Sequence, residues 1–474
     1  MRIPEKAALY IDGEWVDTDR RRPAVNPYTG EEIATVCECP PALLSRALAA
    51  AARGAADIAA MAARERASLI RQAAAAVRGH ADELAHLMAV ETGKPLADGR
   101  TEALRSAETL ELSAEEGLRI EGAHIPMESS AIGAGKIGVS LRFPVGVVAA
   151  ITPFNAPVNL TAHKLGPAWA AGNAVVLKSS PMAALTLQRY VEILAQAGIP
   201  PGWLQSIQGD EAAIGLLRAP EVDFISFTGS SRIGEQVKAG SGLKRVALEL
   251  GGNGYTIVAP DADLEEAART CARNGMRLAG QSCISVQNVC VHRSIYEEFA
   301  RRVAYHASTL RAGDPLDAAT DVGPVINAHS AGRIQGLVDD AVRSGARLML
   351  GGTHRGALVQ PTVLADVPAA CHAVRGEIFG PVVALMPYDD IQAVFSQINA
   401  GPFGLQAGIF TASLPLALEA ARKLRMGAVI VNGSSTWRSD QAPYGGVKAS
   451  GIGREGPRFA IREMTEERFV VFNA

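Results

Sequence analysis

The stretch Val145-Gly-Val-Val-Ala-Ala-Ile151-Thr-Pro-Phe-Asn155 opens the segment that decides the fold. Its first seven residues contain no polar side chain, which is typical of a strand buried on both faces of a parallel sheet. A loop with prolines follows, and the next segment has helical periodicity through Ala171. This order of strand, loop and helix predicts the first unit of an alternating α/β fold.

The same order repeats downstream of this stretch. Strands are predicted at 173–178, 203–208 and 223–227, and helices at 184–197 and about 211–218. Alternation of this kind predicts a parallel, doubly wound sheet of the Rossmann type. A second α/β segment begins after Gly251-Gly252: we predict helices at 262–279 and 296–312, a strand at 286–291, and further alternation to about Val431.

The flanking segments have a different character. Residues 42–120 show the apolar periodicity of helices, whereas 122–144 contains glycines and β-like runs that predict a protruding hairpin. The chain closes with the strand-like run Arg468-Phe-Val-Val-Phe. We therefore expect a first α/β domain from 1–121 and 145–251, a second α/β domain from 252–456, and a small β element from 122–144 and 457–474.

The composition excludes several classes of protein. Of 474 residues, 48% are hydrophobic and 20% charged, with a formal net charge of −3, which is the balance of a globular protein of two or more domains. No basic stripe suits a nucleic acid, and no run approaches the roughly 20 apolar residues that span a bilayer. Because no signal-peptide pattern opens the sequence, we expect a cytoplasmic protein with neither a nucleic-acid nor a membrane partner.

The segment Asp223-Phe-Ile-Ser-Phe-Thr-Gly-Ser-Ser-Arg-Ile-Gly234 combines a predicted strand, a glycine turn and a helix that begins at about Arg232. Free N–H groups and the positive dipole end of such a helix suit an anion such as a dinucleotide pyrophosphate. Gly229 and Gly234 lack the GxGxxG spacing, and no P-loop lysine follows. Taken alone, the segment fits an ordinary structural turn equally well.

Six cysteines occur, and their spacing matches no zinc pattern, so we expect no metal site. Cys283 lies in Gly280-Gln-Ser-Cys283, where the ordinary interpretation is a buried, inert thiol. Two other segments favour a nucleophile instead. Glu249-Leu-Gly-Gly252 places a carboxylate at a strand end, and Thr152-Pro-Phe-Asn155 places a carboxamide after a strand, where open α/β sheets build their active sites.

Together with Gly376-Glu377-Ile-Phe-Gly-Pro381, these segments resemble the aldehyde dehydrogenase superfamily. The resemblance covers nearly the whole chain, with its motifs in the family's order. They are TPFN, the strand end at Lys178, FTGS with Gly234, ELGG, GQxC, EIFGPV and PYGGVKASGIGREG. It implies that the first α/β domain binds NAD(P), that the second is catalytic, and that the small β element serves oligomerisation.

The resemblance implies four catalytic residues. Cys283 matches the nucleophile that forms a thiohemiacetal and then a thioester with the aldehyde. Asn155 matches the carboxamide that, with the Cys283 backbone N–H, stabilises the oxyanion. Glu249 matches the general base that activates water for hydrolysis of the thioester. Glu455 matches a second glutamate of a proton path, although a buried structural carboxylate explains it equally well.

The resemblance also implies the cofactor contacts. Lys178 is expected at the adenosine ribose, Ser230 at the pyrophosphate and Glu377 at the nicotinamide ribose. The complete set of expected cofactor-binding residues is Ile151, Thr152, Pro153, Phe154, Lys178, Ser180, Gly229, Ser230, Gly234, Gly251, Glu377 and Phe379. NAD-preferring members often carry a glutamate three residues after the lysine, whereas this chain has Pro181 there. Because no acid at that position repels a 2′-phosphate, we expect NADP to be accepted, with NAD also possible.

The substrate is expected to be a small polar or anionic aldehyde. The loops around the expected pocket look most like the lactaldehyde, phosphonoaldehyde and phosphoglyceraldehyde branches. Arg105, Arg277 and Arg438 lie near segments that line the family's substrate funnel, where an arginine can hold an anion bidentately. Each also has a structural interpretation; Arg438, for example, can simply pair with Asp440. Ser282, next to the nucleophile, stands where some phosphonate-using relatives have a basic residue.

Two alternatives stay open. An acylating relative passes the thioester to coenzyme A, although the presence of Glu249 argues against this. A non-catalytic scaffold would keep the fold alone, although all four chemical groups (Cys283, Glu249, Asn155 and Glu377) are present. The exposed strand edge of the small β element leads us to expect a homodimer or homotetramer.

Overall fold

The strand predicted at the start of the decisive stretch lies at the centre of an eight-stranded sheet. In the computed structural model, which describes residues 3–473, β8 (Val147–Ile151) pairs in parallel with β9 and β11. The order β22-β12-β11-β8-β9-β10-β2-β3 places the Rossmann arrangement at its centre, since the chain winds outward in both directions from β8. The other strands are β2 (Leu9–Ile11), β3 (Glu14–Val16), β9 (Ala174–Lys178), β10 (Leu204–Ile207), β11 (Phe224–Thr228), β12 (Arg245–Glu249) and β22 (Gly451–Ile452).

Alternate residues of β8 enter two different hydrophobic cores. Val147 and Ala149 pack with helices α1, α7 and α8, whereas Val148 and Ala150 pack with α2 to α6 on the opposite face. Because both faces are covered, the strand has no polar position, which explains the unbroken apolar run. The helices are α1 (Pro41–Ala60), α2 (Ala63–Gly79), α3 (Ala81–Thr92), α4 (Leu96–Gly117), α5 (Pro157–Ala171), α6 (Ala184–Gln196), α7 (Asp210–Arg218) and α8 (Ser231–Gly240).

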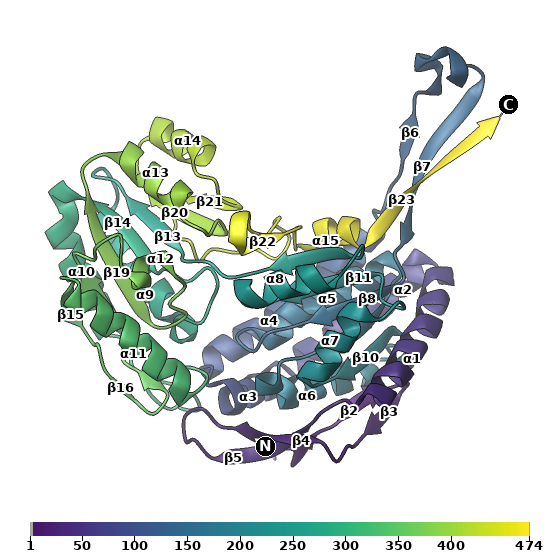
Figure 1. The fold of residues 1–474 in the computed structure, drawn as a ribbon, viewed down its shortest axis with the longest axis horizontal. Coiled ribbons are helices and arrows are strands. Elements are labelled where there is room, and N and C mark those ends of the chain that lie inside the picture. The colour runs from purple at the N-terminus through teal and green to yellow at the C-terminus, as the bar shows by residue number, and fades with distance from the viewer. Residues whose placement is uncertain (1–2, 474) are drawn as a thin grey trace.

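A second, seven-stranded sheet has the order β15-β18-β19-β14-β13-β20-β21 and is parallel except for β15. Figure 1 shows it with its helices as a separate lobe beside the first. Its strands are β13 (Tyr255–Val258), β14 (Asn288–His292), β15 (Arg347–Leu350), β18 (Thr362–Ala365), β19 (Val382–Tyr388), β20 (Gln406–Phe410) and β21 (Ala428–Val431). Its helices are α9 (Leu264–Met276), α10 (Tyr296–Ser308), α11 (Ala328–Arg343), α12 (His372–Arg375), α13 (Ile391–Ala400) and α14 (Leu414–Lys423).

A three-stranded arm projects from the first lobe and carries the C-terminal end of the chain (Figure 1). It consists of β6 (Ala123–Ile125), β7 (Lys136–Pro144) and β23 (Thr465–Asn473), which follows α15 (Pro457–Glu463). β23 pairs antiparallel with β7 along its whole length, from Thr465 opposite Pro144 to Asn473 opposite Lys136. The hairpin predicted at 122–144 is therefore completed by the C-terminal strand of the same chain.

The remaining elements are short. Two small sheets contain β1 (Lys6–Ala7), β4 (Arg21–Val25) and β5 (Glu32–Cys37), and β16 (His354–Arg355) with β17 (Leu358–Val359). Short 3-10 helices are found at Met127–Ser129, Ala131–Gly133, Pro181–Ala183, Pro201–Trp203, Arg277–Gly280, Arg293–Ile295 and Lys448–Ser450. Across residues 3–473, no helix is both long and apolar enough to cross a membrane.

The structure adds strands that the sequence patterns did not reveal. Strands β1 to β5 lie before the first predicted helix, and β13 directly follows Gly251-Gly252. The helix expected to reach residue 279 ends at Met276. β22 extends the first sheet with residues that we assigned to the second domain, and the domain boundaries stay a prediction.

Candidate active site

The candidate site lies where the two large sheets meet. Asn155 follows β8, Ser230 follows β11 and Glu249 ends β12, so all three come from the carboxyl edge of the first sheet. Cys283 precedes β14 and Glu377 precedes β19, so both come from the amino edge of the second sheet. Segments far apart in sequence are thereby brought to one place.

Two cavities meet at Cys283. The first, called here the arginine cavity, has a volume of about 390 Å³ and is lined by all four residues expected to bind substrate: Arg105, Arg277, Ser282 and Arg438. The second, the glutamate cavity, has a volume of about 310 Å³. The predicted residues that line it are Pro153, Phe154, Gly229, Ser230, Glu249, Gly251, Glu377, Phe379 and Glu455. Asn155, Leu160, Cys283, Arg438 and Tyr444 line both cavities, so the same sulfur can be reached from two sides.

A strained turn presents Cys283 to the cavities. Leu278, Ala279 and Gly280 all have positive φ, at 55°, 52° and 67°. Such a conformation costs an ordinary L-residue about 1 kcal/mol or more, and strain of this kind is often retained at functional sites. Gly280 is required for a second reason, because a Cβ there would lie 1.9 Å from the carbonyl oxygen of Gly380.

The Cys283 thiol has one hydrogen-bond partner in the described chain, the hydroxyl of Tyr444, with 3.0 Å between Sγ and the phenol oxygen. Burial raises the pKa of the Cys283 thiol to about 12, and the hydrogen bond from Tyr444 opposes this rise. The resting sulfur is therefore a thiol whose ionisation depends on its surroundings.

Asn155 is positioned against the turn that carries Cys283. Its side-chain Nδ2 donates to the carbonyl oxygen of Gln281 at 2.9 Å, which leaves the second N–H of the amide for another acceptor. Gln281 is itself anchored, since its side-chain oxygen accepts from the N–H of Ile326 at 2.9 Å. The carboxamide thus points at the backbone beside the nucleophile, as an oxyanion donor must.

The loop that carries Asn155 is held by a buried ion pair. Glu102 accepts hydrogen bonds from the N–H groups of Val158 and Asn159 at the start of α5, and Lys94 pairs with the same carboxylate. Ala156, at the start of this helix, cannot cap it, so Glu102 satisfies two of its free N–H groups. Burial lowers the pKa of Lys94 to about 7.

Glu249 is buried, and neither of its carboxylate oxygens has a hydrogen-bond partner within residues 3–473. Burial raises the pKa of Glu249 well above its usual range, and the charge of nearby Glu455 raises it further. A carboxylate without partners at a cavity wall is free to accept a proton from water.

Glu455 has the opposite environment. Its carboxylate accepts from Lys164 at 3.0 Å and from Arg438 at 3.0 Å, and all three side chains are buried. Although burial opposes it, Lys164 and Arg438 lower the pKa of Glu455 to about 2. An ionised group between two cations fits the structural interpretation of Glu455.

The glutamate cavity has the features that a dinucleotide needs. Helix α8 begins beside Ser230, whose side chain accepts from the N–H of Ile233 at 3.4 Å. Glu377 accepts from the N–H of Gly252 at 3.2 Å, and its second oxygen has no hydrogen-bond partner among residues 3–473. A Cβ at Gly251 would lie 2.6 Å from Glu377, so glycine is needed there for the carboxylate to approach. Phe154 and Phe379 meet edge to face, with 6.1 Å between ring centres.

Five of the expected cofactor residues lie outside this cavity. Ile151, Thr152, Lys178 and Ser180 are buried at the ends of β8 and β9, beyond its walls. Gly234 has a packing role instead, because a Cβ there would lie 2.4 Å from Leu250.

An acid approaches Lys178 from an unexpected direction. The carboxylate of Asp210, the first residue of α7, lies 3.8 Å from Lys178 Nζ. Arg22 pairs with both Asp210 and Glu38, so two basic and two acidic side chains gather at the end of β9. Position 181 carries no acid, but the fold brings the acid Asp210 close to Lys178.

Each expected substrate arginine has a carboxylate partner. Arg105 binds Asp440 through two hydrogen bonds, at 2.6 and 3.0 Å, and Arg277 binds Asp98 through Nε at 2.9 Å. The suggested pairing of Arg438 with Asp440 is wrong, because the Arg438 guanidinium turns to Glu455 and stacks on Tyr444. The terminal nitrogens of Arg277 have no partner in the described residues, so its outer edge can accept an anion.

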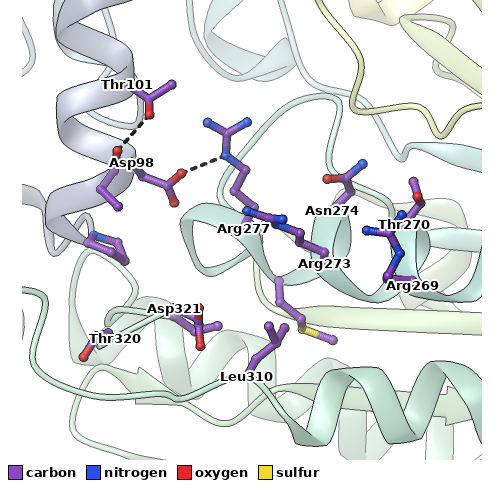
Figure 2. Close-up of a pocket in the computed structure, with 14 residues that line it drawn as sticks. Asp98, Thr101, Arg269, Thr270, Arg273, Asn274, Arg277, Leu310, Thr320 and Asp321 are labelled. Atoms are coloured by element: carbon purple, nitrogen blue, oxygen red, sulfur yellow. Dashed lines mark hydrogen bonds and ion pairs between the residues drawn. The ribbon is translucent and has the colours of Figure 1, made fainter. Parts of the chain in front are cut away.

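Next to the arginine cavity lies a rim pocket of about 510 Å³, which shares with it Asp98, Thr270, Asn274 and Arg277. Figure 2 shows Arg269 and Arg273 on α9, followed by Arg277 directly after its end, with Arg277 bonded to Asp98. Arg273 has no ion pair in the described part of the chain. The approach to the arginine cavity is therefore lined by three guanidinium groups and two carboxylates, those of Asp98 and Asp321.

A model of the aldehyde dehydrogenase family matches residues 15–470. The chain is 43% identical over 467 residues to a 3-sulfolactaldehyde dehydrogenase of Priestia aryabhattai, covering 98% of each protein. This chain belongs to the aldehyde dehydrogenase family. The fold agrees with that of the NADP-dependent glyceraldehyde-3-phosphate dehydrogenase of Bacillus halodurans solved with NADP, with a TM-score of 0.96, 33% identity and 99% coverage of both chains. It agrees equally with an aldehyde dehydrogenase of Physcomitrella patens solved with the reaction product succinate, with a TM-score of 0.95, 36% identity and 99% coverage of both.

This enzyme is thus an NAD(P)-dependent aldehyde dehydrogenase, and the predicted α/β fold is confirmed. Sequence reasoning missed several side chains of its site: Tyr444, Asp98, Lys164 and Asp210. Tyr444 lies inside the quoted PYGGVK segment, so a sequence motif pointed to its neighbourhood. No motif pointed to the other three residues, because each contacts a partner that is distant in the sequence.

Replacement of Gly280 by alanine tests the strained turn of this aldehyde dehydrogenase. We expect Gly280→Ala to lower the melting temperature and to abolish activity, because the new Cβ meets a backbone carbonyl and the φ is positive. Gly332→Ala is the control. Its helical site in α11 has nothing within 4 Å, so stability should rise by about 0.5–1 kcal/mol with activity unchanged. A fully active Gly280→Ala enzyme would contradict the role of the turn.

Proposed function

We propose that this aldehyde dehydrogenase oxidises a small anionic aldehyde to its carboxylic acid through a thioester on Cys283 that water hydrolyses. The observation that carries the proposal is the position of Cys283 at the junction of the two cavities. The arginine cavity contains arginine side chains. The glutamate cavity contains Glu249 and Glu377, each with at least one oxygen that has no partner in the described residues, and the N-terminus of α8.

The first half of the reaction uses Cys283 and Asn155. The sulfur adds to the aldehyde carbon, and the resulting alkoxide accepts a hydrogen bond from the second amide N–H of Asn155. One such donor typically contributes about 3 kcal/mol of barrier stabilisation. Glu377, Ser230, Phe154 and Phe379 would hold the nicotinamide dinucleotide, which would supply the hydride acceptor. As the alkoxide re-forms its C=O bond, the carbon loses its hydrogen as hydride, and a thioester remains on Cys283.

The second half uses Glu249. Its unpaired carboxylate removes a proton from water, and the hydroxide adds to the thioester carbon and releases the acid and the thiolate. Because only the ionised carboxylate is a base and its pKa is raised, hydrolysis should accelerate as the pH rises. An acylating enzyme would need no such base, so the free carboxylate favours water over coenzyme A as the acceptor.

The two halves can be separated by substitution. We expect Cys283→Ala to form no reduced cofactor with any aldehyde. Glu249→Gln should form about one equivalent of reduced cofactor per active site and then stop, because acylation proceeds and hydrolysis fails. Absorbance of the reduced cofactor in stopped flow measures both. In the unaltered enzyme kcat should rise with pH through a pKa above the ordinary carboxyl range.

Two results would contradict this assignment. Turnover by Cys283→Ala would remove the covalent route. A steady rate that depends on added coenzyme A would favour the acylating alternative.

We propose an anionic substrate, with Arg277 as the group that binds its charge. Named relatives act on a sulfonated aldehyde and a phosphorylated one, and a third was solved with a dicarboxylic product. Arg277 lines the arginine cavity with two terminal nitrogens free, which suits a bidentate contact to a sulfonate, phosphate or carboxylate. Arg105 already donates to Asp440 through two nitrogens, and Arg438 is bound to Glu455.

A change at Arg277 should separate charged from neutral substrates. We expect Arg277→Gln to raise KM for a carboxylated or sulfonated short aldehyde about 10- to 100-fold, because a charge-assisted hydrogen bond is lost. KM for a neutral aldehyde of the same length should change little. Arg273→Gln, one turn earlier on α9 and outside the arginine cavity, is the matched control. Equal losses for both substrates would reject the anion contact.

We propose that both NADP and NAD are accepted, with the choice set at the end of β9. Lys178 and Arg22 offer positive charge to a 2′-phosphate, whereas Asp210 and Glu38 oppose it. The two positive and two negative side chains leave a local charge close to zero, so neither NADP nor NAD is excluded.

Removal of the acid beside Lys178 should shift this balance. We expect Asp210→Asn to raise the ratio of kcat/KM for NADP to that for NAD about fivefold, because one negative charge near the phosphate disappears. Glu211→Gln, the next acid on α7, which pairs with Arg20 and not with Lys178, should leave the ratio unchanged. An unaltered ratio in Asp210→Asn would show that the phosphate binds elsewhere.

We also propose that the enzyme forms a homodimer or homotetramer through the arm. One edge of β23 is unpaired in the three-stranded sheet, and Phe469 and Phe472 are more than half exposed on it. An open strand edge with exposed aromatic side chains is suited to a second copy of the chain. A monomeric molar mass in solution would reject this proposal.

A further inference from the structure

A phenol contacts the reacting atom of this enzyme. The Tyr444 hydroxyl lies 3.0 Å from Cys283 Sγ, and the hydroxyl makes no other hydrogen bond in the described residues. Tyr444 is 6% exposed and lines both cavities. The contact is therefore made at the point where substrate and cofactor meet.

Three contacts hold Tyr444 in this position, and a fourth anchors the arginine that makes one of them. The backbone N–H and C=O of Tyr444 pair with Glu455, at 3.1 and 2.6 Å. The Arg438 guanidinium lies 3.8 Å from the centre of the Tyr444 ring, and the same guanidinium donates to the Glu455 carboxylate. Because ring and backbone are both fixed, the hydroxyl cannot turn away from the sulfur without breaking this buried cluster.

The surroundings favour Tyr444 as the donor. Burial raises the pKa of Tyr444 well above its usual value, so the phenol keeps its proton throughout the working pH range. The cation on the ring face draws electron density from the phenol and thereby strengthens the O–H as a donor. A thiolate is a good acceptor, and a hydrogen bond to a charged form favours that form.

We propose that Tyr444 is a catalytic residue that donates its O–H to Cys283 and so stabilises the attacking thiolate, with Arg438 as the residue that positions it. The thiol proton passes to water in the cavity, the electron pair stays on sulfur, and Tyr444 keeps its own proton. The sulfur then forms its bond to the aldehyde carbon, whose π electrons move to the oxygen facing Asn155. This inference rests on the proposed role of Cys283 as nucleophile.

The test is the reactivity of Cys283 in the full-length Tyr444→Phe enzyme, which keeps the ring that Arg438 stacks on. We expect alkylation by iodoacetamide to be about tenfold slower at pH 7, the pH profile to move upward by about one unit, and kcat/KM to fall in parallel. Raising the pH should restore much of the loss. The Cys283→Ser enzyme gives the background from the other five cysteines, which are buried.

Tyr388→Phe is the matched control. Tyr388 is also buried and donates to the carbonyl of Val258, but it lines neither cavity, so its loss should leave the alkylation profile unchanged. Unchanged or faster alkylation in Tyr444→Phe would overturn the inference, because the phenol would then be a spectator or an acceptor from the thiol. A loss of kcat/KM that is independent of pH would assign Tyr444 a merely structural role. If instead Cys283→Ser keeps oxidising aldehydes, it is the proposed function that fails.

Discussion

Two opposed sheet edges govern the active site of this enzyme. The carboxyl ends of β8, β11 and β12 deliver Asn155, Ser230 and Glu249, and the segments entering β13, β14 and β19 deliver Gly252, Cys283 and Glu377. Strand ends are anchored by the hydrogen-bond ladders behind them, so each group has little freedom. Asn155 crosses the gap with a hydrogen bond of 2.9 Å to Gln281, whereas the 3.2 Å bond from Gly252 to Glu377 joins two segments of the second edge.

The two buried glutamates beside the nucleophile have the same side chain, but their surroundings shift their pKa values in opposite directions. Two cations lower the pKa of Glu455, whereas burial without a hydrogen-bond partner in residues 3–473 raises the pKa of Glu249. Chemically equal groups with pKa values pushed apart are typical of sites that move protons. Lys164 and Arg438 therefore affect Glu249 indirectly. They keep Glu455 ionised, and the negative charge of Glu455 raises the pKa of Glu249.

The same charges organise the substrate side. Arg105 is bound on two nitrogens by Asp440, which also contacts His163 and Asn159, so this part of the wall is rigid. Within residues 3–473, Arg277 is bound through Nε alone, and its two terminal nitrogens have no partner. The difference between a structural and a substrate-facing arginine thus lies in how many of its donors the protein already uses.

The sequence alone determined the order of strands and helices and the identity of the reactive groups. The apolar run before Ile151 predicts a strand covered on both faces, since that pattern depends only on which positions are buried. Cys283, Glu249 and Asn155 could be named because their motifs are contiguous and resemble a family. Tyr255–Val258 was missed because four residues are too few to show a period.

Only the tertiary structure decided which charges face one another. Arg105 and Asp440 are 335 residues apart, Lys164 and Glu455 are 291 apart, and Asp210 on helix α7 reaches Lys178 at the end of strand β9. Local sequence carries no information about such pairs, because they form only after the two sheets have packed. For the same reason the sequence placed Tyr444 in a motif but did not predict its contact with the sulfur of Cys283. Residue types and their periodicity determined the fold and its chemical inventory, and the packing of one sheet edge against another determined the geometry.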